Sequence, residues 1–344
     1  RGNHMTDNGA KTKIRISTGA SRKALIWENK TITWEEFVKR LTTTTRTKET
    51  VAEYRAMPKS EQDDIKDIGG FVGGTLKQGR RKNGYVESRS VVTLDLDNCE
   101  PEDIDLIESF STSALVIYST HKHTAKKPRV RLCIPLTREV TPEEYEAVAR
   151  KLAANTGIDM DCFDDTTFEP TRLMYWPSTS SDGEFIGKEL AGRWTDPDRI
   201  LQEYADWHDL SQWPISSRIQ TKTARSADKA GDPLTKPGIV GAFCQAYTIE
   251  AAIETFLSDV YVPYDKIPGR YSFVGGSTGG GLVIYDGKYA YSNHSTDPAG
   301  GQLSNAFDLV RIHKFGELDI NVTPDMHINK YPSYKKMCDW ASHD

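Results

Sequence analysis

The hydrophobic and polar positions of the first half of the chain predict a sheet whose central strand ends in acids. Residues 91–96 are almost all apolar or β-branched, as expected of a strand buried on both faces. Residues 114–118 form a second apolar run, and a short basic loop connects it to Arg129–Leu136 in a hairpin pattern. Residues 13–17 alternate between polar and apolar side chains and predict a short edge strand.

Helices are predicted from capping residues. Thr33 and Thr141 each stand three residues before a glutamate, which is the pattern of a capping box. The first helix is expected to run to Leu41 and the second to end near Gly157, while residues 101–110 predict a surface helix. Strands that alternate with helices in this way indicate the α/β (α+β) class.

The length of 344 residues allows about two domains. Residues 1–12 are expected to be a tag scar and a disordered lead-in, and residues 13–213 the larger domain. Residues 214–236 are rich in Ser, Thr, Lys, Ala and Asp, which predicts a linker. Residues 237–344 predict a smaller α/β domain with short strands, in which Asp286-Gly287 marks a tight hairpin turn.

The composition of the chain limits its partners, the kinds of site it carries and the compartment in which it works. The net charge of −5 argues against a uniformly basic nucleic-acid binder, although a local basic groove remains compatible with it. Five scattered cysteines without a Cys-x-x-Cys pair predict neither a disulfide framework nor a zinc site. This usage indicates a reducing, cytoplasmic compartment. The sequence contains no apolar run of 18 residues, so no membrane span is expected.

The central strand ends in two carboxylates. Side chains alternate faces along a strand, so Asp95 and Asp97 point to the same side. Two adjacent carboxylates repel each other and resist burial unless a cation compensates them. Hard divalent ions such as Mg²⁺ and Mn²⁺ prefer oxygen ligands, which favours a metal site. The alternative is a strand that runs into solvent with both acids exposed.

Further acids follow the second capped helix. Asp159, Asp161, Asp164 and Asp165 lie within seven residues of each other. Such a segment is either a loop surrounded by water or the source of a remaining ligand for the metal site.

Cations occur on both sides of the acidic strand. Arg129 and Arg131 share one face of the hairpin's return strand, where they suit bidentate phosphate contacts or pair with surface acids. Upstream, the glycines of residues 69–74 precede the cationic segment 77–82. Glycines let a backbone approach phosphates closely, but a solvated turn would have the same composition.

Taken in order, these motifs resemble those of the archaeo-eukaryotic primase (primase–polymerase) superfamily, in the form found in phage and mobile-element replication proteins. Asp95 and Asp97 match its first motif and Ser119-Thr120-His121 its second. Phe163-Asp164, eight residues before Arg172, is similar to its third. The resemblance covers roughly residues 60–185.

The resemblance implies a catalytic core of two abutting α/β parts, the later one built on a sheet like that of RNA-recognition modules. It implies nucleotidyl transfer with two Mg²⁺ or Mn²⁺ ions held by Asp95, Asp97 and Asp164. Ala at both Asp95 and Asp97 is then expected to abolish incorporation and to leave the fold intact. Asp159, Asp161 or Asp165 remain alternatives for the third ligand.

The resemblance also implies partners, namely a single-stranded DNA template and primer and NTP or dNTP substrates. It implies that a helicase domain often follows on the same chain, and that the protein acts in a bacterial host cell. His123 is an alternative to His121 as the histidine of the second motif. The expected nucleotide-binding residues are Ser119, His121, Lys127, Arg129, Arg131 and Arg172. The expected template-binding residues are Lys77, Arg80, Arg81 and Lys82.

Three other functions use similar residues. A metal-dependent nuclease also needs clustered carboxylates but no triphosphate grip. A replication-initiator nicking enzyme is suggested by His121 and His123, but Lys122 stands between them where such enzymes carry a hydrophobic residue. A non-catalytic nucleic-acid-binding module would leave the acids as solvated loop ends.

Overall fold

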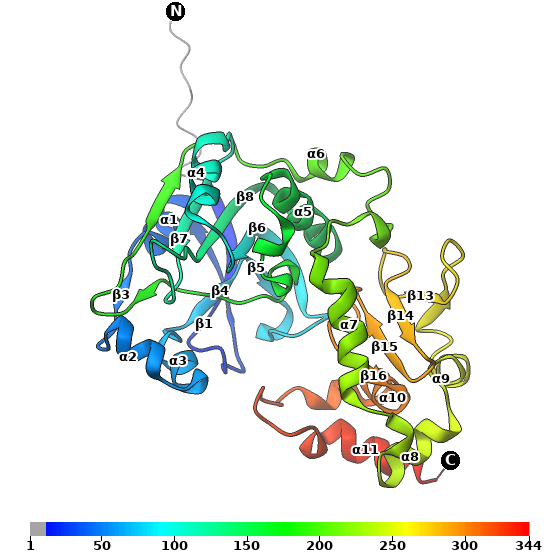
Figure 1. The fold of residues 1–344 in the computed structure, drawn as a ribbon. Coiled ribbons are helices and arrows are strands. Elements are labelled where there is room, and N and C mark those ends of the chain that lie inside the picture. Colours follow the sequence, from blue (N-terminus) through cyan, green and yellow to red (C-terminus); the bar gives the residue numbers. More distant parts are fainter. Residues whose placement is uncertain (1–11, 344) are drawn as a thin grey trace, which may run out of the picture. The chain divides into compact units, whose positions relative to one another are not determined.

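The computed structural model describes residues 12–343, so the expected tag at residues 1–5 lies outside the described residues. The chain divides into two compact units. The first is formed by the chain up to Glu203 together with Pro214–Ser216, and the second by Tyr204–Trp213 and the chain from Ser217 onward. Figure 1 labels elements of both units on the ribbon, which is coloured by residue number.

The first unit combines antiparallel sheets with short helices. Its α-helices are α1 (Trp34–Leu41), α2 (Val51–Ala56), α3 (Lys59–Ile65), α4 (Pro101–Phe110), α5 (Pro142–Asn155) and α6 (Pro197–Gln202). Its strands are β1 (Lys13–Gly19), β2 (Glu28–Thr33), β3 (Thr45–Arg46), β4 (Gly70–Val72), β5 (Gly74–Leu76), β6 (Val86–Leu96), β7 (Leu115–Ser119), β8 (Val130–Val140), β9 (Met174–Tyr175), β10 (Ser178–Thr179) and β11 (Gly187–Leu190).

Two sheets dominate this unit. One has the order β2-β1-β4-β9 and the other the order β11-β7-β8-β6-β5, with antiparallel neighbours throughout. The β7–β8 hairpin and both capped helices are confirmed, with complete capping boxes at Thr33 and Thr141. The expectation that β1 is an edge strand is wrong, because β1 pairs with β2 on one side and β4 on the other. The alternating polar residues of β1 fit an edge strand. Which strands pair with β1 depends on other segments of the chain, which the pattern of β1 itself does not reveal.

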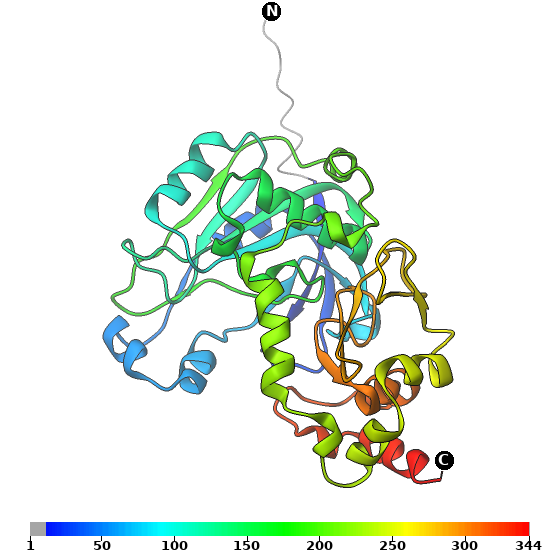
Figure 2. The same ribbon diagram turned by 45° about the vertical axis from the view of Figure 1, so that its right-hand side comes forward.

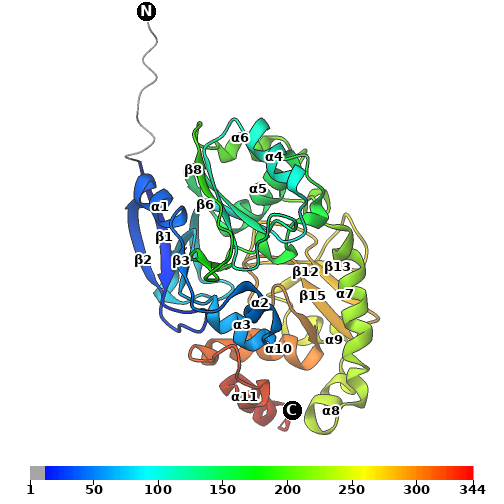
Figure 3. The same ribbon diagram turned by 60° about the vertical axis from the view of Figure 1, so that its left-hand side comes forward.

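The core of the first unit lies between its sheets. Phe37 and Leu41 of α1 are fully buried and pack with Phe71 of β4 and Val116 of β7. Figure 3 shows α1 with β1 and β2 on one side of β6 and β8, and α5 with α4 on the other side. Helix α5 covers β6 on that second face. Strand β6 is therefore buried on both faces, as its apolar composition predicts.

A buried cation joins β6 to the segment after α5. Arg89 is completely buried and its guanidinium lies 3.8 Å from the centre of the Tyr145 ring. It donates hydrogen bonds to the carbonyl oxygen of Pro170 at 2.7 Å and to Thr93 Oγ1 at 3.1 Å. Burial lowers the pKa of Arg89, so these contacts compensate a charge that has lost its water. Arg89 thus fixes residues 164–172 relative to β6.

The second unit is a five-stranded antiparallel sheet with helices, in the order β12-β13-β14-β15-β16. Asp286 and Gly287 both have positive φ, as a type I′ turn requires, so the predicted hairpin between β14 and β15 is confirmed. The strands are β12 (Tyr261–Pro263), β13 (Arg270–Phe273), β14 (Leu282–Tyr285), β15 (Tyr289–Ser292) and β16 (Leu303–Asn305). The helices are α7 (Ser217–Ala230), α8 (Gly238–Ala246), α9 (Ile249–Phe256), α10 (Ala306–Phe315) and α11 (Pro332–Ala341).

The segment expected to be a linker, residues 214–236, is mostly helical, and its role as a linker stays a prediction. Most of it is helix α7, which Figure 2 shows as one uninterrupted helix, and Pro233–Thr235 forms a 3-10 turn. Lys, Arg, Gln and Ala have good helix propensity, which the low hydrophobicity of the segment concealed. Residues 204–213 also belong to the second unit, so the chain passes between the units more than once.

The α/β class is confirmed, whereas the likeness of the larger sheet to that of RNA-recognition modules stays a prediction. Within residues 12–343, no helix has the length and apolar character needed to cross a membrane.

Arg89→Ala is expected to lower the free energy of unfolding by about 3 kcal/mol or more, because it leaves a cavity and strips buried oxygens of their donor. Urea denaturation would measure the loss. The control is Arg15→Ala, which removes a surface pair with Glu139 between side chains that are 48% and 36% exposed. That control should cost no more than about 1 kcal/mol. Equal losses in both variants would contradict the buried role of Arg89.

Candidate active site

The register of β6 and β8 pairs acids with arginines. Asp95 lies directly opposite Arg131, and the same register places Arg129 opposite Asp97. Arg131 Nε donates to Asp95 Oδ2 at 3.1 Å, and Arg129 Nη1 donates to Asp97 Oδ1 at 3.2 Å. The inner pair is buried, whereas each side chain of the outer pair is 36% exposed. Two alternating acids therefore face two alternating cations across adjacent strands.

A third acid reaches this point from the segment after α5. Phe163 forms an isolated bridge with Leu96, and the Asp164 amide donates to the carbonyl oxygen of Asp95 at 2.9 Å. Thr167 Oγ1 accepts from the Asp95 amide at 2.8 Å and is fully buried. These main-chain contacts fasten residues 162–167 to the end of β6. Asp164 is thereby brought beside Asp95 and Asp97, as the third motif predicts.

The three carboxylates influence one another. Burial raises the pKa of Asp97, and the negative charges of Asp95 and Asp164 raise it further against the opposing effect of Arg129. Asp164 Oδ2 accepts from Arg172 Nη2 at 3.1 Å, so each acid of the trio has an arginine partner. The trio is therefore a concentrated negative site that arginines partly neutralise.

Two other candidate acids of this segment, Asp159 and Asp165, accept hydrogen bonds from neighbouring groups of the protein. Asp159 Oδ1 accepts from the Asp161 amide at 2.9 Å at the start of a 3-10 turn. Asp165 Oδ1 accepts from Ser216 Oγ. Asp164 also accepts from the Thr166 amide, but its second oxygen faces Arg172. Of these acids, Asp164 is the one whose main chain is bonded to Asp95, and its role as the third ligand stays a prediction.

The fit of this site to divalent cations can be judged from its oxygens. Asp95 Oδ1 is buried and has no hydrogen-bond partner among the described residues, so it retains unused capacity for a ligand. Each of the three carboxylates pairs with an arginine, and among residues 12–343 no three His, Cys, Asp or Glu side chains are arranged to hold a metal ion together. The donor set is oxygen-rich and suits Mg²⁺ or Mn²⁺, but it requires the acids to turn from their arginines.

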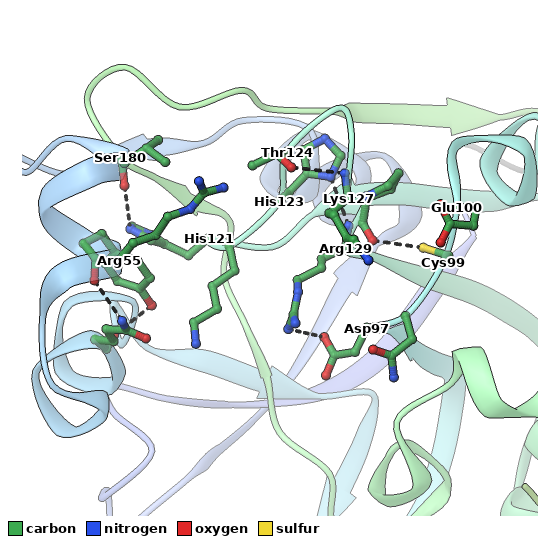
Figure 4. Close-up of a pocket in the computed structure, with 16 residues that line it drawn as sticks. Arg55, Asp97, Cys99, Glu100, His121, His123, Thr124, Lys127, Arg129 and Ser180 are labelled. Carbon is green, nitrogen blue, oxygen red and sulfur yellow. Dashed lines mark hydrogen bonds and ion pairs between the residues drawn. The ribbon is translucent and has the colours of Figure 1, made fainter. Parts of the chain in front are cut away.

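A cavity adjoins the outer acid–arginine pair. Its volume is 490 Å³, within the range of small-molecule sites, and Asp97 and Arg129 lie on its wall (Figure 4). The loop between β7 and β8 and the helix α2 form other parts of the wall. The charged and ionisable side chains on it include Arg55, Asp97, His121, Lys122, Lys127 and Arg129. The predicted residues Lys127 and Arg129 are therefore brought together with Asp97 at one cavity.

His121 is held in a buried network. Its Nε2 lies 2.8 Å from Glu49 Oε1 and its Nδ1 lies 2.9 Å from Ser178 Oγ. The ring of Tyr54 packs against it, with 4.4 Å between the ring centroids. Burial lowers the pKa of His121, against the raising effect of Glu49. Both ring nitrogens are thus engaged, so a direct phosphate contact, which stays a prediction, would need one of these bonds to open.

His123 and Ser119 have different surroundings. His123 Nδ1 accepts from the Arg129 amide at 3.1 Å, which leaves Nε2 as the protonated nitrogen of the neutral ring. His123 Nε2 is buried without a hydrogen-bond partner among the described residues, and burial lowers the pKa of this histidine. Ser119 Oγ accepts from the Ile186 amide at 2.8 Å, a contact that holds β11 beside β7.

The expected template-binding loop has mixed exposure. Arg81 donates to the carbonyl oxygen of Thr171 at 3.2 Å and lies over the Trp27 ring, and burial lowers its pKa. Arg80 donates to the carbonyl oxygen of Leu25 at 2.7 Å, and Lys82 lies over the Tyr85 ring. Lys77 is exposed. Two of the four cations are therefore engaged with the protein's own backbone.

The upstream glycines have a packing role. A Cβ atom at Gly74 would overlap the carbonyl oxygen of Ser88, and one at Gly70 would overlap Met174. These residues lie in β4 and β5, where they allow close approach of neighbouring strands. The glycines are thus explained by the sheet rather than by a phosphate cradle.

Two cavity residues, Arg55 and Lys122, have no counterpart among the predicted nucleotide-binding residues. Arg55 lies on α2, whose sequence indicates only a polar surface helix. Lys122 lies between the two histidines. No local pattern distinguishes these cations from solvated ones, since their position depends on how α2 packs against the hairpin loop.

The comparisons with known proteins identify the family. The model of the VapE N-terminal domain matches residues 4–216, which is more than half of the chain. The chain belongs to the VapE N-terminal domain family. The VapE match ends where the first unit ends, at Ser216, so the trio and the cavity lie within it and most of the second unit lies outside it.

Two solved structures are similar to this VapE-type chain. The primase–polymerase AEP domain of cyanophage S-2L shares 14% identity over 56% of this chain and 89% of its own, with a TM-score of 0.31. The primase RepB′ shares 11% identity over 72% of each chain, with a TM-score of 0.28. Both likenesses are distant. No curated protein matches the sequence. The resemblance to replication proteins of the primase–polymerase type, drawn from the motifs, is taken up as a proposal below.

The two first-motif acids should differ in their effect on stability. Asp95→Ala leaves Arg131 buried without its carboxylate partner, so it is expected to cost about 3–5 kcal/mol, whereas the expectation that the fold stays intact remains a prediction. Asp97→Asn removes a charge whose pKa is raised, so at pH 7 it should leave stability within about 1 kcal/mol of wild type or increase it.

The pH dependence of unfolding tests the sign of the Asp97 effect. A raised pKa in the folded state means that the ionised carboxylate lowers stability above that pKa, and that the penalty disappears once the group is protonated. Any advantage of Asp97→Asn over wild type should therefore shrink as the pH falls. Urea melts between about pH 4 and 8 measure it, and an advantage that grows in acid would contradict the assignment.

Proposed function

We propose that the first unit catalyses metal-dependent, template-directed nucleotidyl transfer that starts and extends primers in phage or mobile-element DNA replication. The observation that carries this proposal is an acidic trio of which one member, Asp97, lies on the wall of a cationic cavity of 490 Å³. Asp95, Asp97 and Asp164 would supply oxygen ligands, and Arg129 and Lys127 supply positive charge on the cavity wall. Membership of the VapE N-terminal domain family agrees with a replication role.

In this proposal the trio would hold Mg²⁺ or Mn²⁺. When bound, such ions lower the pKa of the primer 3′-hydroxyl and stabilise the charge of the leaving pyrophosphate. Asp97 and Asp164 would turn away from Arg129 and Arg172, which become available to the anionic substrate. The arginine that neutralises each acid in the free protein would thus exchange a carboxylate for a phosphate.

The residues divide into contacting and positioning groups. Arg129 is half-exposed on the cavity wall and Lys127 is exposed, so both can reach a triphosphate. Arg131 is largely buried beside Tyr118 and the carbonyl oxygen of Tyr175, so its proposed role is to orient Asp95. Ser119 and His121 would hold the hairpin loop through the contacts that engage them.

The proposed partners are a single-stranded DNA template, a primer and NTP or dNTP substrates. The exposed face of the segment from Lys77 to Lys82 remains a candidate for contact with the template backbone. We also propose the cytoplasm of a bacterial host as the setting and a helicase as a partner on a longer chain. The second unit would be an accessory to primer initiation or template binding.

Asp97→Asn should reduce nucleotide incorporation by at least about a hundred-fold, because the reacting phosphoryl group loses part of its charge stabilisation. Extension of primed and unprimed single-stranded templates with labelled NTPs and dNTPs, in Mg²⁺ and in Mn²⁺, measures the effect. Asp159→Asn is the matched control, since it removes an acid that only caps a 3-10 turn. Full activity of Asp97→Asn would refute the proposal.

The same assay separates the alternatives. A metal-dependent nuclease would shorten the template and incorporate nothing. A nicking enzyme would leave a covalent adduct between protein and DNA. A binding module would retard the template on a gel in the wild type and in Asp97→Asn alike, without any change in its length.

Arg129→Ala should raise the KM for nucleotides by about ten-fold and change template affinity much less. The reason is that Arg129 faces the cavity and loses a charge-assisted phosphate contact on substitution. Steady-state kinetics give the KM, and fluorescence anisotropy of a labelled oligonucleotide gives the template affinity. An unchanged KM with weakened template binding would instead place Arg129 on the template path.

A further inference from the structure

The cavity wall opposite the acids carries cations that the motifs do not include. Arg55 comes from α2 and Lys122 from the loop between β7 and β8. Figure 4 shows Arg55 and Asp97 on opposite sides of the cavity. Neither the Arg55 side chain nor the Lys122 side chain has a hydrogen bond or an ion pair with another described residue. Their charge is therefore available to a bound anion.

The electrostatic surroundings of Lys122 indicate an excess of positive charge. Burial lowers the pKa of Lys122, and the nearby cations Lys66 and Arg129 lower it further, against a smaller opposing effect of Asp63. Asp63 is itself paired with Lys66 at 2.7 Å. A ligand with several negative charges would relieve this repulsion. The pKa shift agrees with the position of these residues around the cavity.

Helix α2 is fixed in place, although it is short. Thr50 and Glu53 form a capping box, and the Val51 amide donates to Asp182 Oδ1 at 2.7 Å. Glu49, which directly precedes the cap, accepts a hydrogen bond from His121 Nε2 at 2.8 Å, and Tyr54 packs on the histidine ring. The backbone that carries Arg55 is thus tied to the loop that carries Lys122. A site built on fixed elements needs less ordering when it binds its ligand.

We propose that Arg55 and Lys122 bind the outer phosphates of the incoming nucleoside triphosphate. This inference rests on the proposed function, in which the acids mark the end of the cavity where the innermost phosphate reacts. The outer phosphates then extend away from Asp97 toward the side of the cavity where Arg55 lies, and Lys122 lines the same cavity. Arginine offers a planar pair of donors for one phosphate, and lysine adds a point charge.

A phosphate of the template backbone has the same chemistry as a nucleotide phosphate. The nucleotide is the favoured occupant because the site is a cavity beside the reacting centre and has the volume of a small-molecule pocket. The two sources are distinguished by measuring nucleotide and oligonucleotide binding with the same variants.

The experiment measures binding to the full chain without turnover. Fluorescent nucleoside triphosphate and monophosphate, and a labelled single-stranded oligonucleotide, are titrated against wild type, Arg55→Ala, Arg55→Lys and Lys122→Ala. The control is Arg199→Ala, which changes an arginine of the same unit that is 83% exposed and pairs only with the nearby Asp196. Circular dichroism and urea melts confirm that each variant is folded.

Arg55→Ala and Lys122→Ala should each weaken triphosphate binding by about ten-fold, with monophosphate and oligonucleotide binding changed less than about two-fold. Arg55→Lys should lie between wild type and Arg55→Ala because it keeps the charge and loses the paired donors. Equal losses for triphosphate and monophosphate, or unchanged triphosphate binding, would overturn the inference. Loss confined to the oligonucleotide would assign these cations to the template.

Failure of the proposed function gives a different result. In that case wild type binds no nucleoside triphosphate with or without Mn²⁺, and it incorporates none in the extension assay, which removes both proposals. If wild type incorporates nucleotides and Arg55→Ala binds triphosphate as tightly as wild type, only the assignment of Arg55 and Lys122 is wrong.

Discussion

The first unit depends on the compensation of negative charge at the end of a buried strand. Asp95 is buried near the end of β6, and Asp97 and Asp164 stand beside it. Carboxylates in such a place repel one another and lack water. Arg131 from β8, Arg129 directly before β8 and Arg172 after the third acid compensate them, one for each acid. Because the compensation comes from the neighbouring strand, the register of β6 and β8 and the ionic site determine each other.

This arrangement keeps charged side chains available for a ligand, and it does not maximise the stability of the fold. A buried pair such as Asp95 and Arg131 contributes little net stability compared with apolar residues of the same volume, yet its disruption is costly. The outer pair is half-exposed and easily exchanged. A substrate that brings both cations and phosphates can satisfy the acids and the arginines at once. The free protein thus holds each charged group near the place where a ligand of opposite sign would bind.

Buried polar side chains connect the functional segments to the fold. Arg89 connects β6 to Pro170 through a hydrogen bond to its carbonyl oxygen. Thr167 connects the segment that contains Asp164 to the main chain of Asp95. On the other side of the site, the contact between Glu49 and His121 ties the start of α2 to the hairpin loop. Each of these contacts joins residues more than 70 positions apart in the chain. They fix the distances between short motifs that carry little structure of their own.

The sequence alone determined several elements and the common face of Asp95 and Asp97, because both follow from local periodicity. The apolar run of β6, the β7–β8 hairpin, the capping boxes at Thr33 and Thr141 and the turn at Asp286-Gly287 each depend on a few adjacent residues. Helix α7 was missed because its polar composition fits a linker as well as a helix.

Only the tertiary structure decided which side chains meet. It placed β1 inside a sheet, assigned the upstream glycines to strand packing and brought the main chain of Asp164 against that of Asp95. It also brought Arg55 to the cavity from a helix without any distinguishing pattern. Periodicity sets the face of its own element on which a residue lies. The partner across that face comes from segments far away in the chain, and only packing and strand register bring those segments together.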